Sequence, residues 1–115
     1  MNNEHLKSVI DTAIAFNQGV TGWNTGNVTN MSNAFAEDDD FNVDIGNWDV
    51  SNVTYMMRMF ASASAFNQDL SSWDVSNVNN MESMFEAAHT FNQDVSSWDV
   101  SKVTSMYSMF ISANA

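Results

Sequence analysis

The sequence repeats every 25 residues, and this period constrains the fold more than any other feature. The four repeat units span residues 16–40, 41–65, 66–90 and 91–115, without insertion or deletion. Six positions are identical in all four units, and three of them are Trp23, Trp48, Trp73 and Trp98; Phe16, Phe41, Phe66 and Phe91; and Asn17, Asn42, Asn67 and Asn92. Such self-similarity is typical of stacked repeats, in which each unit packs on its copies around a shared core. We call each set of equivalent residues a column, and we expect these three columns to form the structural core.

Within one unit, the pattern predicts a strand, a turn and a short helix. Trp73 and Val75 flank a polar residue, which is the alternation of a strand. The Asp, Ser and Asn residues of segment 74–80 favour a turn. Apolar residues then recur at helical spacing between Val78 and Ala88. So short a helix must bury its apolar stripe to be stable. The pattern therefore predicts an α/β repeat, a solenoid in which each unit contributes a short parallel strand, a turn and a short helix.

The two ends of the chain differ. Residues 1–15 match the second half of a unit by hydrophobic pattern only, and we expect them to form an N-terminal capping helix, a half-repeat. Residues 16–115 then make one solenoid domain of four repeats. The C-terminal end carries no such cap, which predicts either a fragment of a longer array or homo-association through that end. Two C-terminal ends would meet as an isologous dimer, whereas end-to-start stacking would produce open filaments.

Three of the units carry a specific resemblance. The runs FNVDIGNWDVSNVTYMMRMF, FNQDLSSWDVSNVNNMESMF and FNQDVSSWDVSKVTSMYSMF resemble the mycoplasma-lipoprotein-type surface repeat, a domain of unknown function related to BspA-like leucine-rich repeats. The first unit departs from the pattern at Gly19, Asn24 and Thr25. The resemblance implies a leucine-rich-repeat-like solenoid that is part of a longer protein, at the cell surface or secreted. It also implies adhesion or partner binding and no known catalytic activity.

Charge and composition narrow the choice of partners. Fourteen acidic residues against three basic ones give a net charge of −11, which repels nucleic acid and anionic lipid. The chain has no Cys and therefore no disulfide or zinc–thiolate site. It lacks the run of about 18 apolar residues that a membrane span needs. The N-terminal segment also lacks the pattern of a signal peptide. We therefore expect no nucleic-acid partner and no direct membrane insertion.

No arrangement of residues predicts an enzyme. His5 and His89 are not repeated, and there is neither a G-x-S-x-G nucleophile motif nor a phosphate-binding glycine run. Catalytic sites need different side chains converging on one point, whereas stacked repeats present identical rows that suit binding. We expect a non-catalytic binding or adhesion module. The alternative is a self-assembling structural or spacer module without a ligand of its own.

The outward positions of the predicted strand row are the candidate binding site. They form a polar and acidic row, which we call the predicted ligand row: Asn47, Asp49, Ser72, Asp74, Ser97 and Asp99. Such a row favours a protein ligand with a basic surface, a glycan, or a cation bridge. No cofactor and no metal is expected. Calcium is the alternative for the two acidic columns, the second being Asp44, Asp69 and Asp94, but no calcium-loop motif is present. We favour the hypothesis that each Asp accepts backbone N–H groups in its own turn.

Overall fold

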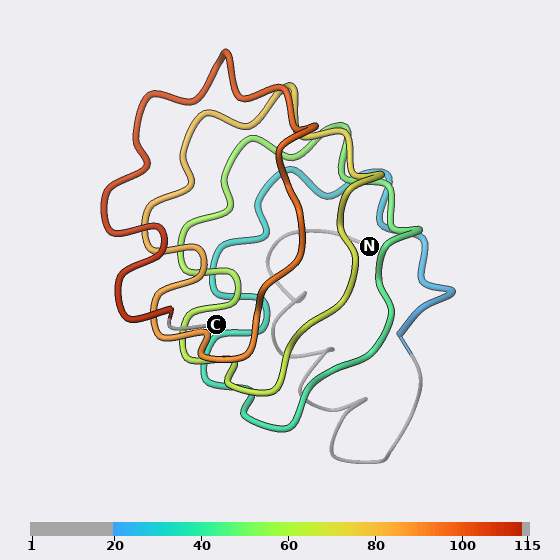
Figure 1. Cartoon of the computed structure of the whole chain (residues 1–115). Helices are drawn as coiled ribbons and strands as arrows, with labels where there is room; N and C mark the ends of the chain where they lie inside the picture. Colours follow the sequence, from blue (N-terminus) through green and yellow to red (C-terminus); the bar gives the residue numbers. More distant parts are fainter. Residues whose placement is uncertain (1–19, 114–115) are drawn as a thin grey trace.

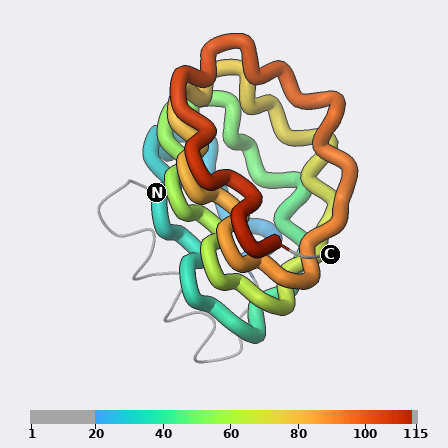
Figure 2. The backbone as a smooth tube through the Cα atoms, turned by 60° about the vertical axis from the view of Figure 1, so that its left-hand side comes forward, coloured from blue at the N-terminus to red at the C-terminus, as the bar shows by residue number. Residues whose placement is uncertain are grey.

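The computed structural model describes residues 20–113, and over this range the chain winds into stacked coils. Figure 1 views the stack with the last coil in front, and Figure 2 shows successive coils lying side by side from the blue end to the red end. We number the coils by repeat unit: coil 1 is described over 20–40, coil 2 over 41–65, coil 3 over 66–90 and coil 4 over 91–113.

The coils contain turns in place of the predicted strands and helices. Residues 20–113 include no helix, and their only strand-like pairings are the isolated parallel bridges Asn30–Tyr55, Tyr55–Asn80 and Asn80–Ser105. The prediction of an α/β leucine-rich-repeat-like solenoid built from strand–turn–helix units is therefore wrong. No helix of this part of the chain is long and apolar enough to cross a membrane. The predicted capping helix at 1–15 lies outside the described residues, as do Phe16 and Asn17.

A ladder of turns stands where the short helix was expected. In coil 2, the N–H groups of Met56, Arg58, Phe60 and Ser62 donate to the carbonyl oxygens of Asn80, Glu82, Met84 and Glu86 in coil 3, at 2.7–2.9 Å. The intervening N–H groups stay within the coil, since Met59 donates to the Met56 oxygen and Ala61 to the Arg58 oxygen. We call these segments, residues 30–37, 55–62, 80–87 and 105–112, the turn ladder. Bonds to the next coil alternate along the segment with bonds inside the coil. Buried backbone groups need hydrogen-bond partners, and here they find them without a helix or a sheet.

The turn ladder depends on left-handed backbone at residues other than glycine. Eight such residues have a φ between 54° and 65°: Asn33, Glu37, Arg58, Ser62, Ser83, Ala87, Ser108 and Ser112. Each is the third residue of a turn closed by an N–H to C=O bond over three residues, as from Ala63 to Phe60. A positive φ at this position is what a type II turn requires.

The spacing between coils explains why a helix cannot form here. The rings of Phe35, Phe60, Phe85 and Phe110 stack with centroids 5.4–5.5 Å apart from one coil to the next. Packed helices need 8–10 Å between their axes. Coils at this spacing are too close for each to contain a helix at this position, and each contributes one layer of extended or turn backbone. The apolar stripe is buried nonetheless: Val78, Met81, Met84, Phe85 and Ala88 have no exposed surface.

Two phenylalanine columns face each other inside the stack. Within a coil, the ring of Phe60 lies 4.3 Å from that of Phe66, and the ring of Phe85 lies 4.2 Å from that of Phe91. Between coils, the second column stacks at 5.7 Å and 6.0 Å. Repeating the same side chain at the same place lets one packing arrangement recur in every coil, and this double column forms the centre of the core.

Candidate functional site

The tryptophan column joins neighbouring coils through its indole nitrogens. The Nε1 of Trp48, Trp73 and Trp98 donates to the carbonyl oxygens of Val20, Ile45 and Leu70, at 2.9–3.0 Å. These three rings are buried, whereas Trp23 is half-buried. The buried indole N–H is therefore paired, as a polar group inside a core must be.

The asparagine column lies at the surface, and its side-chain oxygens bind the backbone of the next coil. The Oδ1 of Asn42 accepts from the N–H of Asn67 at 2.8 Å, and the Oδ1 of Asn67 accepts from the N–H of Asn92 at 3.0 Å. Gln68 adds a bond from its Nε2 to the same Asn42 oxygen. Asn42 and Asn92 are exposed and Asn67 is half-buried. The column is thus a peripheral clamp between coils and not part of the buried core.

The acidic residues of the predicted ligand row close their own turns. The Oδ1 of Asp49 accepts from the N–H and the hydroxyl of Ser51, at 3.0 Å and 2.5 Å, and Asp74 binds Ser76 in the same way. Asp99 accepts from the N–H of Ser101. Each Asp side chain therefore completes a turn at a corner of its coil, which is a structural role for this residue type.

These bonds also change the acidity of the carboxyl groups. In five aspartates the hydroxyl and then the N–H of the serine two residues later lower the pKa below its ordinary value of 3.8: Asp49, Asp69, Asp74, Asp94 and Asp99. Repulsion along the column works in the opposite direction, because Asp49 and Asp99 raise the pKa of Asp74. The bonds from Ser76 outweigh this repulsion, so the pKa of Asp74 is lowered on balance.

The uncharged members of the predicted ligand row are also exposed. The hydroxyl of Ser72 donates to the carbonyl oxygen of Gly46 at 3.0 Å, and that of Ser97 donates to the oxygen of Ser71 at 3.3 Å. Asn47 lies at the equivalent position of coil 2. The row is accessible, but most of its polar groups take part in bonds that form the turns and join the coils.

The acidic residues do not gather into a metal site. Among residues 20–113, no three carboxylate, histidine or cysteine side chains lie close enough to hold an ion. The acidic run from Glu37 to Asp40 lines an open hollow of about 300 Å³ beside Phe41. His89 is exposed.

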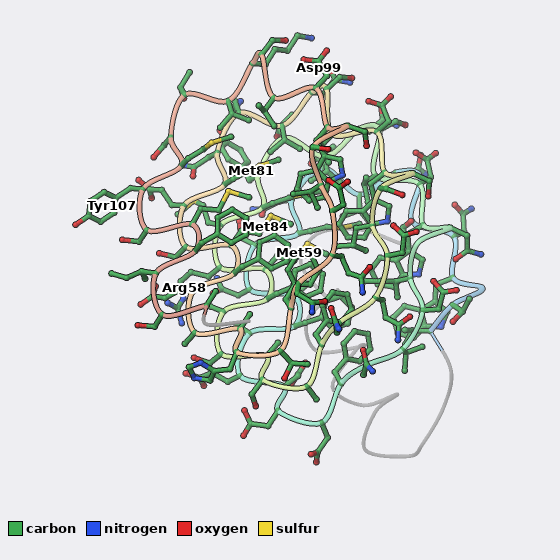
Figure 3. All side chains as sticks on the ribbon, viewed as in Figure 1. Arg58, Met59, Met81, Met84, Asp99 and Tyr107 are labelled. Atoms are coloured by element: carbon green, nitrogen blue, oxygen red, sulfur yellow. The ribbon has the colours of Figure 1, made fainter. Side chains whose placement is uncertain are left out.

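A second surface varies from coil to coil, and sequence reasoning missed it. It is the outer face of the turn ladder, where Figure 3 shows Arg58 and Tyr107 pointing away from the stack while Met59 and Met84 point inward. Equivalent positions carry different side chains in successive coils: Asn30, Tyr55, Asn80 and Ser105; Ser32, Met57, Glu82 and Tyr107; Asn33, Arg58, Ser83 and Ser108; and Ala36, Ala61, Glu86 and Ile111, of which Ala61 alone is buried. We call this surface the ladder face. The variation within a constant repeat was the signal that could have identified it.

The ladder face combines exposed aromatic groups with charges. Tyr55 is 44% exposed and Tyr107 is 78% exposed. The Nη1 of Arg58 lies 3.7 Å from the Oε2 of Glu86, and the two side chains are 43% and 38% exposed. The backbone beneath these side chains makes the same ladder bonds in each coil, so different side chains stand on one repeated backbone frame.

The comparison with protein families gives one match over almost the whole chain. The family described as "Mycoplasma protein of unknown function, DUF285" matches residues 4–115. The chain belongs to this family. No curated protein and no solved structure gave a significant match. The DUF285 description states no activity, so the function has to be argued from the surfaces described above.

Proposed function

We propose that the chain is a non-catalytic binding or adhesion module that takes a protein ligand on its ladder face. The observation that supports this is the contrast between an invariant backbone and a variable, partly aromatic surface. Stacked-repeat proteins use such extended surfaces for binding. Tyr and Arg are enriched among the residues that dominate protein interfaces, and the ladder face exposes Tyr55, Arg58 and Tyr107.

The charge of the chain favours a ligand with a basic surface. The net charge is −11, and hydrogen bonds from serine lower the pKa of Asp49 and Asp74, which favours their charged form. Complementary charge raises the rate of association and selects against acidic partners. A glycan remains the second ligand class. The sequence resemblance adds a location at the cell surface or outside the cell, within a longer protein, and a relationship to BspA-like repeats stays a prediction.

The test compares three forms of the chain as bait for surface proteins extracted from the source cells and from their growth surface. The first is the wild type and the second carries Tyr55→Ser and Tyr107→Ser. The third carries Asp49→Asn, Asp74→Asn and Asp99→Asn, in which the amide oxygen can still accept the turn bonds. We expect the tyrosine variant to lose the proteins that the wild type retains, while the asparagine variant keeps at least part of them. Retention that is unchanged by the tyrosine substitutions would contradict the proposal, as would no specific retention at all.

The runner-up function is a self-assembling or spacer module. The uniform repetition favours it, because the phenylalanine rings stack with centroids 5.4–5.5 Å apart at each of the three interfaces between coils. Such a module would retain no surface protein in the experiment above and would instead bind a copy of its own repeat.

A further inference from the structure

Coils 2 and 3 place apolar and acidic side chains next to each other on the ladder face. In coil 2, Tyr55 is exposed and Met57 is half-buried. In coil 3, the position equivalent to Met57 carries Glu82, which is also half-buried. Equivalent positions lie side by side in the stack, since the N–H of Arg58 donates to the carbonyl oxygen of Glu82 at 2.9 Å. An apolar side chain and a carboxylate therefore meet where these two coils join.

Both glutamates of coil 3 are held by a neighbouring coil. The Oε1 of Glu82 accepts from the hydroxyl of Ser105 in coil 4 at 2.8 Å. The Oε2 of Glu86 lies 3.7 Å from the Nη1 of Arg58 in coil 2, whose side chain points away from the stack (Figure 3). No residue of 20–113 pairs with the second oxygen of either carboxylate. Each glutamate therefore offers one oxygen to a ligand.

The charges of this patch do not balance. Glu82 and Glu86 carry two negative charges, and Arg58 carries one positive charge. Lys102 lies at another corner of the stack, where its Nζ donates to the Oδ1 of Asn77 at 3.0 Å. One negative charge is thus in excess between coils 2 and 3, and a single cation would neutralise it. The net charge of −11 also attracts cations from a longer range.

We propose that coils 2 and 3 form a subsite for a lysine side chain of the ligand. This inference rests on the proposed function and names the chemical group that the ladder face takes. The ammonium group binds the available oxygens of Glu82 and Glu86, and the four-carbon stem lies along Met57 and Tyr55. Lysine side chains bury such a stem on apolar surface while the charged end stays among polar groups.

The existing contacts of the glutamates favour lysine over arginine. A guanidinium binds a carboxylate best through two parallel bonds, one to each oxygen. Here one oxygen of each glutamate is already engaged, by Ser105 in one case and by Arg58 in the other. An ammonium group is a compact charge with three donors, so it can bind single oxygens of two different carboxylates.

The test titrates the full chain with three capped tripeptides, Gly-Lys-Gly, Gly-Arg-Gly and Gly-norleucine-Gly, and follows the backbone amides by NMR. We expect the lysine peptide to shift the amides of Met57, Glu82 and Glu86, with a Kd about threefold below that of the arginine peptide. Norleucine keeps an apolar stem without the charge and should not saturate the shifts. Arginine binding as tight as lysine binding would overturn the proposal, as would shifts that follow the aspartate columns instead.

Matched removal of two acidic groups locates the subsite. Glu82→Gln with Glu86→Gln should weaken lysine-peptide binding by about fivefold. Asp74→Asn with Asp99→Asn changes the net charge by the same amount and should leave the Kd within about twofold. The amide spectrum of each variant also shows whether it keeps the fold. Equal weakening by the two pairs would mean attraction to the overall charge and would refute the subsite.

Matched removal of one basic group tests the role of the ion pair. Arg58→Gln releases the second oxygen of Glu86 and should tighten lysine-peptide binding by about twofold. Lys102→Gln makes the same change in net charge away from the subsite and should leave the Kd unchanged. The reverse order of these two variants would contradict the assignment of Glu86 to the subsite.

The bait experiment described above separates this inference from the proposed function. It is repeated with the variant that carries Glu82→Gln and Glu86→Gln, which we expect to lose the proteins that the wild type retains. If the tyrosine variant loses them and the glutamine variant keeps them all, the lysine subsite is refuted and the proposed function stands. Retention unchanged in both variants would overturn both.

Discussion

The indole Nε1 of Trp73 donates a 3.0 Å hydrogen bond to the carbonyl oxygen of Ile45, in the preceding coil. The bond is buried, and Trp73 itself is 4% exposed. Because the same bond recurs at Trp48 and Trp98, each tryptophan both fills the core and connects two coils through a directional contact. We therefore expect substitutions in the tryptophan column to be tolerated less well than those in the phenylalanine columns, because phenylalanine rings have no hydrogen-bond donor to lose.

Replacing Trp73 by Phe tests this role. Trp73→Phe removes the buried bond and part of the ring volume, and we expect it to lower the free energy of unfolding by about 2 kcal/mol. Urea denaturation followed by circular dichroism measures the change. Tyr107→Phe alters an exposed aromatic residue and should stay within about 0.5 kcal/mol of the wild type. Equal effects of the two substitutions would contradict the inferred role of the indole bond.

Glycine substitutions test the left-handed backbone of the turn ladder. Ala87 has a φ of 57°, which costs an ordinary L-residue about 1 kcal/mol. Ala87→Gly should relieve this cost and raise the free energy of unfolding by up to about 1 kcal/mol. Ala36 is also half-buried but does not have a positive φ, so Ala36→Gly should instead lower the free energy of unfolding by about 0.5–1 kcal/mol. Thermal or urea unfolding of the pair gives two shifts of opposite sign, and shifts of the same sign would argue against these backbone angles.

The aspartate turns predict a loss of stability in acid. The folded pKa of Asp49, Asp74 and Asp99 lies below 3.8, the ordinary value that applies to the unfolded chain. Their stabilising contribution is thus complete above pH 3.8 and is lost as the pH falls below 3.8 and through the lower folded pKa. Denaturant unfolding between pH 6 and pH 2 should show this decline. Replacing all three by Asn should flatten it, and a decline of the same size in that variant would point to other carboxyl groups.

Amide exchange distinguishes the turn ladder from a helix in each coil. In the ladder, Met81, Ser83 and Phe85 donate to coil 4, and their exchange should be slow. The equivalent amides of Met106, Ser108 and Phe110 should exchange faster, since no acceptor within residues 20–113 pairs with them. A helix over the same residues would protect Ser83 and Phe85 and, equally, Ser108 and Phe110 through bonds within the coil. Slow exchange in coil 4 of the free chain, together with a helical circular dichroism spectrum, would contradict the structure.

The repeat period could be read from the sequence, but the internal structure of the coil could not. Apolar residues at 78, 81, 84, 85 and 88 face inward in a helix and equally in the turn ladder, so the pattern did not discriminate between them. Left-handed positions are often marked by glycine, yet here they carry residues such as Arg58, Ser62 and Ala87. The decisive quantity was the separation of the coils, which sequence spacing does not contain.

The candidate site, like the fold, could be predicted from the sequence only in part. Exposure of Asp49, Asp74 and Asp99 followed from their polarity, and their hypothesised role in local turns agrees with the bonds to the serines. The ladder face was not predicted, because the sequence was interpreted as a short helix in each unit. In a helix, the outward residues of one unit would point in several directions and would not form a single face. On the turn ladder, by contrast, Arg58 and Tyr107 point away from the same side of the stack (Figure 3).

The uniform step of the ladder bonds has a consequence for how the chain folds. Each of these bonds joins residues 24 positions apart, whether it lies in the first interface or the last. The sequence separation of the contacts therefore does not grow as coils are added, and the entropy of closing each loop stays the same. Folding can therefore begin at any coil, and the other coils can then add to it one at a time. A one-residue insertion would disturb the register of the interfaces beside it and leave distant coils able to pair.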